Sequence, residues 1–244
     1  MDQLVSRLLL YGNLGQDSIL MKLSKLFQDW KGNNCPRQVL IRGIYDQVKA
    51  LLDLATDYGF DENLWQNYLT FLLITDENPF SLTCEKVGAN DGSVNAFAKS
   101  DFAAFMELFH FDFSRIEAEL GIDVFSRITN YRSIVKKELM YNKNVSEKVR
   151  ALSEKLAQAK DETEFFQCVT GFYHDYGVGM FGLNKAFRLA GTGDSLRFQA
   201  INNMDTVMLD DLVGYEIQKK QLVENTEAFV SGRKANNEIG RAHV

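Results

Sequence analysis

The sequence predicts a mainly α-helical protein. Apolar residues recur at spacings of three and four along most of the chain, which is the period of an amphipathic helix. Only two prolines occur in 244 residues, so few positions oppose helix formation. Hydrophobic residues make up 45% of the chain and charged residues 25%, which is the balance of a globular protein with a real core.

Amphipathic helices are predicted over residues 37–55, 61–74, 144–159 and 161–177. Each range has an apolar face at helical spacing, and Gly177 is a natural end for the last one, because glycine readily adopts the left-handed conformation that follows a helix. The expected apolar faces comprise Ile41, Ile44, Tyr45, Val48, Leu52 and Ala55; Leu64, Tyr68, Phe71 and Leu72; and Val145, Val149, Leu152 and Leu156.

Two helix starts are predicted from capping signals. Ser100 is the expected N-cap of a helix over 100–111, with Asp101 in its first turn, where a carboxylate complements the helix dipole. Ser114 and Glu117 have the spacing of a capping box.

The N-terminal stretch "LLLYGNLGQDSIL", residues 8–20, raises the question of a phosphate-binding loop. Such a loop needs G-x-x-x-x-G-K-[ST], because backbone N–H groups surround the phosphates while a lysine neutralises them. With Ser18 at the last position, Asp17 stands where the lysine is required and Tyr11 where the first glycine is required. We therefore predict a turn between two helices, the second starting at Asp17 and Ser18. "AGTGDS" at 190–195 lacks the lysine too.

Glycines become frequent after residue 177, in "GVGMFG" and "AGTGDS". We expect irregular chain from about 177 to 208, with a short strand at "LRFQAI", residues 196–201. A last helix is predicted from Tyr215 to about Ser231, followed by Gly232. Its expected apolar face comprises Tyr215, Leu222, Val223, Phe229 and Val230, which should pack on the helical domain or on a core outside this sequence.

The segment "LDDLVGYEIQKKQLVENTEAFVSGRKANN", residues 209–237, resembles the start of the ATPase module in an uncharacterised bacterial family of AAA+-like P-loop ATPases. In that family a helical N-terminal region comes first, and a hydrophobic strand and the P-loop follow. "GVGMFGLNKAFRL" at 177–189 is similar to the same family, so the resemblance covers about a quarter of the chain. It implies a helical domain over 1–197 that recognises a protein partner or substrate, and the opening turn and helix of an α/β P-loop module over 198–237.

The resemblance further implies that the intact protein binds ATP with Mg²⁺ and forms a homo-oligomer. It assigns adenine contacts to Val213, Gly214 and Tyr215, since glycine lets the backbone approach a flat base and apolar neighbours supply the walls. From the turn alone, the simpler interpretation is a plain helix start with Asp210 or Asp211 as its cap and Val213 in the core.

The last seven residues, "EIGRAHV" at 238–244, depart from the family pattern. They back-translate to the sequence of a common short-read sequencing adapter, so we expect them to be non-native and the gene to be interrupted just before its P-loop. The chain by itself is therefore expected to lack ATPase activity, and no catalytic or metal-binding residue is assigned in it.

Charge is segregated along the chain. Residues 45–77 carry seven acids against one base, and residues 127–150 carry seven bases against two acids. Tyr131 and Tyr141 interleave the basic stretch, which suggests an alternative function: a non-enzymatic binding module for nucleic acid or an acidic protein. Solvated helix faces, or pairing of the two stretches, are favoured instead, and the net charge of −6 also argues against a dedicated nucleic-acid binder.

The remaining chemistry-bearing residues point to no specific site. His174 is next to Asp175, but neighbouring residues on a helix are not expected to face each other; His110 is expected at the end of a core helix. Three cysteines lie far apart without metal-binding spacing. Without a signal peptide or an apolar run of membrane-spanning length, we expect a cytoplasmic protein that does not enter the membrane.

Overall fold

The computed structural model describes residues 1–14, 18–134, 143–184, 186–191, 196–201 and 208–237. The chain divides into two compact units, Met1–Asn203 and Met204–Val244. The predicted domain boundary at 197/198 falls within a strand of the first unit, and the predicted non-native tail, 238–244, lies outside the described residues.

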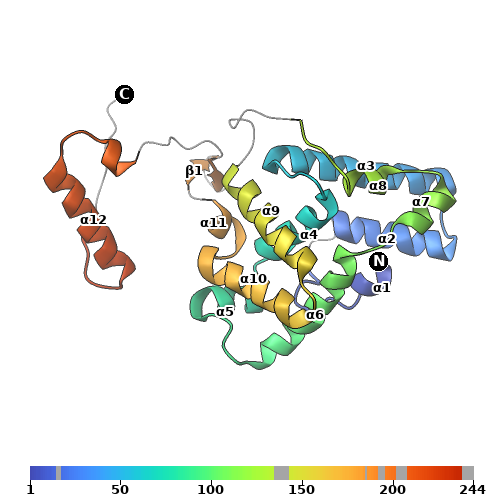
Figure 1. Cartoon of the computed structure of the whole chain (residues 1–244), viewed down its shortest axis with the longest axis horizontal. Coiled ribbons are helices and arrows are strands. Elements are labelled where there is room, and N and C mark those ends of the chain that lie inside the picture. The colour runs from blue at the N-terminus through green and yellow to red at the C-terminus, as the bar shows by residue number, and fades with distance from the viewer. Residues whose placement is uncertain (15–17, 135–142, 185, 192–195, 202–207, 238–244) are drawn as a thin grey trace. The chain divides into compact units, whose positions relative to one another are not determined.

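The first unit is built from helices, with one two-stranded sheet among its described residues (Figure 1). This confirms the predicted mainly α-helical fold. The helices are α1 (Asp2–Val5), α2 (Ile19–Gly32), α3 (Arg37–Tyr58), α4 (Leu64–Thr75), α5 (Pro79–Val87), α6 (Ser93–Phe109), α7 (Ser114–Leu120), α8 (Val124–Ile128), α9 (Lys143–Gln158), α10 (Glu162–Tyr176) and α11 (Gly179–Leu183); the strands are β1 (Phe187–Ala190) and β2 (Arg197–Ala200).

Helix α4 is the central element of this unit. It packs against α3, α6, α9, α10 and α11, and it is buried around most of its circumference. A helix with apolar residues around most of its circumference is stable only inside a protein, and the sequence "LWQNYLTFLLI" has this pattern. The indole N–H of Trp65 donates to the Leu108 carbonyl at 2.7 Å and satisfies the one polar group of that buried ring.

The predicted stripe of α9 is confirmed: Val145, Val149, Leu152 and Leu156 are all buried. The prediction that Tyr45 belongs to the buried face of residues 37–55 is wrong, because its ring is exposed on α3. A tyrosine can extend one helical face without entering the core, since its hydroxyl keeps contact with water.

Both predicted capping signals are wrong. Helix α6 begins at Ser93 and not at Ser100, so Asp101 lies in its middle, fully buried. Helix α7 begins at Ser114, but the Asp112 carboxylate accepts the Ser114 N–H at 2.8 Å, and Glu117 accepts the N–H of Ser126 at 2.9 Å instead of closing a box. Other hydrogen-bond partners outcompete the predicted motif in both places: distant backbone N–H groups for Asp101, and the nearby Asp112 and Ser126 for Ser114 and Glu117.

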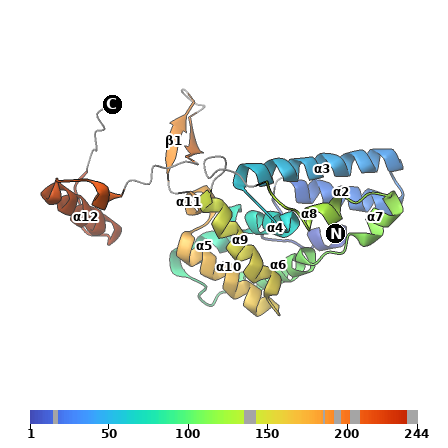
Figure 2. The same cartoon turned by 45° about the horizontal axis from the view of Figure 1, so that its top comes forward.

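Glycine allows the chain to turn sharply after α10. Gly177 ends this helix as predicted, with φ +80°. A side chain on Gly182 would place its Cβ 2.4 Å from the carbonyl carbon of Gly177, so the two backbone segments touch. The short helix α11 and the strand β1 were not expected here, whereas β2 lies within the predicted strand. Strand β1 pairs antiparallel with β2 from Phe187↔Ala200 to Ala190↔Arg197, in a hairpin that projects from the helices (Figure 2).

The second unit has little internal core among its described residues. It consists of a 3₁₀ turn, Leu209–Asp211, and helix α12, Glu216–Val230, which confirms the predicted last helix. Asn225 holds the chain that follows α12: its side-chain amide donates to the Asn236 carbonyl and accepts the Asn236 N–H, both at 2.8 Å.

Candidate functional site

The turn before α12 carries the residues that resemble an adenine site. Gly214 and Tyr215 both have left-handed backbone, with φ +85° and +60°. The side chain of Val213 is 95% exposed and that of Tyr215 is 72% exposed. A Cβ added to Gly214 would meet no atom within 4 Å. The turn therefore presents open backbone between two exposed apolar side chains.

This geometry contradicts the simpler interpretation of the turn as a plain helix start. Tyr215 is the N-cap of α12, and its side chain makes no capping hydrogen bond. The Asp211 carboxylate accepts the N–H of Met208 at 2.7 Å, in the preceding 3₁₀ turn, so it does not cap α12. Val213 is exposed and is not part of a core. A non-glycine residue with left-handed backbone costs about 1–3 kcal/mol and is typical of functional turns.

Helix α12 leaves most of its apolar residues uncovered. Tyr215 and Phe229, which belong to the predicted face, are largely exposed, as are Ile217 and Val230. The side chain of Lys219 reaches toward the turn before the helix: its ammonium donates to the Leu212 carbonyl at 3.0 Å and pairs with Glu216 at 2.7 Å. Exposed apolar surface of this kind is typical of a protein interface.

The N-terminal glycine-containing turn does bind an anion, but the anion is a side chain of the protein. The Asp101 carboxylate accepts the backbone N–H groups of Leu9 at 2.9 Å, Leu10 at 2.8 Å and Tyr11 at 3.0 Å. The turn links two helices as predicted, and Ser18 caps the second by accepting the Met21 N–H. Because a carboxylate already occupies these three amides, they are not available to a phosphate.

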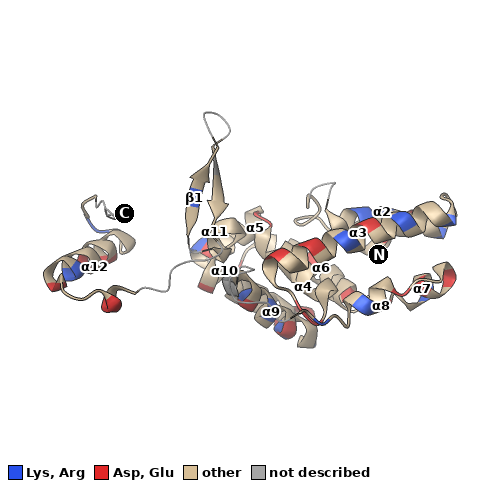
Figure 3. Cartoon of the chain, turned by 90° about the horizontal axis from the view of Figure 1, so that it is seen from above, with Lys and Arg blue, Asp and Glu red and all other residues tan. Residues whose placement is uncertain are grey.

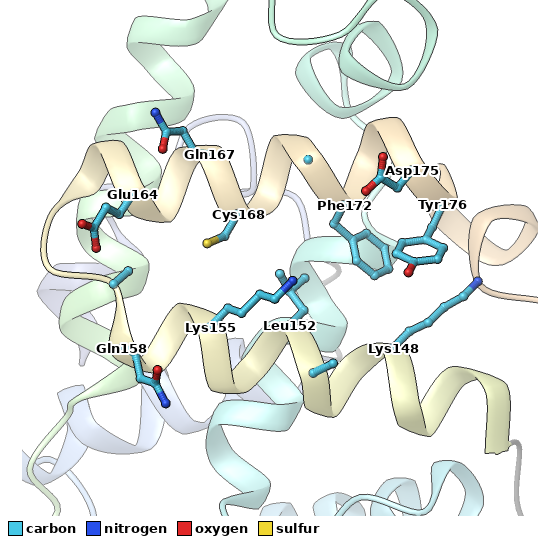
Figure 4. Close-up of a pocket in the computed structure, with 13 residues that line it drawn as sticks. Lys148, Leu152, Lys155, Gln158, Glu164, Gln167, Cys168, Phe172, Asp175 and Tyr176 are labelled. Carbon is cyan, nitrogen blue, oxygen red and sulfur yellow. The ribbon is translucent and has the colours of Figure 1, made fainter.

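A groove of about 560 Å³ runs between α9 and α10 (Figure 4). Lys155 and Cys168 face each other across it, while Lys148 extends to the ring of Tyr176, with its ammonium 4.7 Å from the ring centre. Burial raises the pKa of the Cys168 thiol, and the charge of Lys155 only partly opposes this rise. Cys168 is therefore a protonated thiol at neutral pH and not an activated nucleophile.

The two histidines of the described chain are exposed. His110 is the C-cap of α6, as expected for the end of a core helix. His174 was not expected to face Asp175, yet its Nδ1 lies 3.0 Å from the Asp175 carboxylate. Exposed side chains at a helix end have the freedom to reach a neighbour, and at this position the pair stays in solvent.

Acidic residues of the 45–77 stretch pair with bases of their own helix. On α3, Asp46 pairs with Arg42 at 3.0 Å and Asp53 with Lys49 at 2.6 Å, and both signs of charge alternate along this helix (Figure 3). The charge of Arg150 also helps to lower the pKa of the Asp61 carboxyl. Binding of nucleic acid or an acidic protein by residues 127–150 stays a prediction, because 135–142 lie outside the described residues.

Across the described ranges, no group of three or more histidine, cysteine, aspartate or glutamate side chains is arranged to hold a metal ion. None of the described helices combines the length and the apolar character needed to cross a membrane.

Comparison with known proteins finds one family. A family described as "Protein of unknown function (DUF815)" matches residues 183–240. The match runs from the end of α11 through the hairpin and α12, and it includes the turn at 213–215. No curated protein and no solved structure is similar enough to match the chain. Over residues 183–240 the chain is therefore similar to a family of unknown function.

Proposed function

We propose that this chain is the N-terminal part of an ATP-binding, AAA+-like ATPase, in which the helical unit recognises a protein partner or substrate. The observation that carries the proposal is the open left-handed turn at Gly214 and Tyr215, next to a helix whose apolar residues are uncovered. Such a turn would form one wall of an adenine pocket, and the apolar residues of α12 would pack on the nucleotide-binding core.

The fit to ATP differs between the base and the phosphates. The bare backbone at Gly214 leaves room for a flat ring, and Val213 and Tyr215 flank it with apolar surface. The phosphates and Mg²⁺ need backbone amides, a lysine and a hydroxyl, which G-x-x-x-x-G-K-[ST] would supply. No segment of this sequence has that pattern, and the backbone amides of Leu9, Leu10 and Tyr11 are engaged by Asp101. The chain thus fits the base alone.

The experiment is a nucleotide titration of the protein continued through its expected P-loop, in wild-type form and with Gly214→Val. A valine at φ +85° strains the backbone and fills the space of the base, so we expect ATP affinity to fall about tenfold or more, in line with a loss of 1–3 kcal/mol of base contact. Gly171→Ala is the matched control, because an added Cβ there meets nothing within 4 Å.

The proposal fails if Gly214→Val binds ATP as tightly as the wild type. It is supported if the loss is confined to adenine nucleotides and is absent with inorganic triphosphate, which lacks the base.

A further inference from the structure

The backbone of the turn at 213–215 needs something to hold it. Tyr215 has φ +60°, a left-handed conformation that strains a residue with a side chain and persists only where its surroundings impose it. Packing does not impose it here, because Val213 and Tyr215 are exposed and a Cβ on Gly214 would meet no atom within 4 Å. Hydrogen bonds therefore have to fix the turn.

One residue, Lys219, binds the chain at both ends of this turn. Its backbone N–H donates to the Tyr215 carbonyl at 2.8 Å, as the first hydrogen bond of α12. Its ammonium reaches back over seven residues and donates to the Leu212 carbonyl at 3.0 Å. Within the described ranges, no other side chain forms a hydrogen bond with residues 212–215. Val213 and Gly214 are thereby enclosed between two carbonyls that the same residue binds.

The Lys219 side chain is committed to this contact. It is 17% exposed, whereas the side chain of the adjacent Lys220 is 75% exposed. Ordering a long lysine side chain costs conformational entropy, so a lysine on an exposed helix ordinarily extends into water, as Lys220 does. The Glu216 carboxylate lies 2.7 Å from the Lys219 ammonium and balances its charge. The ammonium is thus directed at the turn and paired within the protein.

A turn that is already fixed favours binding of the proposed nucleobase. Apparent affinity falls with the fraction of molecules that are in the binding-competent form, so a turn that must be ordered on binding binds more weakly. We propose that Lys219 is the positioning residue of this turn: by holding the Leu212 carbonyl, it keeps Gly214 and Tyr215 in the left-handed form that leaves their backbone open to the base. This inference rests on the proposed function, which supplies the base as the ligand.

The first test examines the turn itself, in the whole chain without nucleotide. Positive φ brings the N–H and Hα protons of one residue close together, so the wild type should give a strong intra-residue NOE between these two protons of Tyr215. Lys219→Met keeps the length of the side chain and its helix propensity but removes the N–H donors. We expect the Tyr215 NOE to weaken in this variant to the level of residues with negative φ, while the NOEs between successive amides of α12 stay unchanged.

Two further variants isolate the hydrogen bond. Lys220→Met is the matched control, because it makes the same chemical change at a lysine whose ammonium is 3.7 Å from Glu224 and does not contact the turn. It should leave the Tyr215 NOE as in the wild type. Lys219→Arg supplies new N–H donors and should restore the NOE. An unchanged NOE in Lys219→Met overturns the proposal, as does an equal loss in Lys219→Arg or a loss of the α12 amide NOEs.

The second test measures binding in the protein continued through its expected P-loop. Lys219→Met should weaken ATP binding about fivefold, the typical net worth of one hydrogen bond, and leave binding of inorganic triphosphate unchanged. Lys220→Met should bind both ligands as the wild type does. Equal ATP affinity in Lys219→Met and the wild type contradicts the positioning role. If the wild type itself binds no ATP, the proposed function fails, whereas the NOE of the shorter chain still decides whether Lys219 holds the turn.

Discussion

The carboxylate of Asp101 accepts the backbone N–H of Tyr11 at 3.0 Å, although 90 residues separate the two in sequence. The same carboxylate holds the N–H groups of Leu9 and Leu10. The Asp101 carboxylate thus binds the backbone amides at the start of a glycine-containing turn that resembles a phosphate loop in outline. These hydrogen bonds attach the N-terminal segment to the middle of α6.

Replacing Asp101 should therefore destabilise the protein strongly. Asp101→Asn keeps the shape but turns an NH₂ donor toward backbone donors, so we expect a loss of about 3 kcal/mol in the free energy of unfolding. Urea denaturation measures this loss. The exposed Asp91→Asn should change stability by less than about 0.5 kcal/mol. A loss below about 1 kcal/mol for Asp101→Asn would show that these hydrogen bonds matter little.

The Tyr11 and Tyr173 hydroxyls lie 2.7 Å apart, and Tyr173 donates to the Leu73 carbonyl, also at 2.7 Å. Tyr173 has one proton, so Tyr11 must be the donor between the two rings. Tyr173→Phe leaves the Leu73 carbonyl without its hydroxyl donor and the Tyr11 hydroxyl without its Tyr173 acceptor, so it should cost about 2 kcal/mol, whereas Tyr11→Phe should cost about 1 kcal/mol. Chemical denaturation of both variants checks the order; the reverse order would contradict the assigned direction.

Alkaline pH should destabilise the fold through its buried tyrosines. Burial raises the pKa of Tyr68 to about 12 and also raises that of Tyr173. Unfolded tyrosines release their protons near pH 10, so this stability is fully present below pH 10 and is lost as pH rises toward 12. Tyr68→Phe should flatten the dependence of unfolding free energy on pH between 10 and 12. An unchanged slope would mean that Tyr68 does not contribute.

Two glycines should respond in opposite ways to alanine. Gly182→Ala forces a Cβ against the backbone of Gly177, and we expect a loss of about 1–3 kcal/mol. Gly171 lies within α10 with open space around it, so Gly171→Ala should stabilise the protein by up to about 1 kcal/mol through helix propensity. Thermal unfolding of the pair is the measurement, and similar melting temperatures would count against the tight turn.

This chain alone should not bind ATP tightly. Contact with one face of a base contributes about 1–3 kcal/mol, less than the roughly 4 kcal/mol that corresponds to millimolar affinity. Calorimetric titration with ATP and Mg²⁺ should show no saturable heat. A micromolar dissociation constant would mean that a phosphate site exists elsewhere in the chain.

Helices with one apolar stripe were predictable, because their pattern depends on a single neighbouring surface. Val145 and Val149 of α9 are examples. Interactions between distant residues were not predictable: nothing near Ser100 in the sequence indicates that Asp101 binds Tyr11. The turn at Gly214 was found through resemblance, and its exposed backbone was not evident from composition.

The most direct test of the proposed function is the coding sequence that follows the Asn237 codon in the source genome. We expect a hydrophobic strand and then G-x-x-x-x-G-K-[ST], in frame with the segment 209–237. Reading frames that continue without a strand and P-loop would contradict the assignment of this chain to an ATPase.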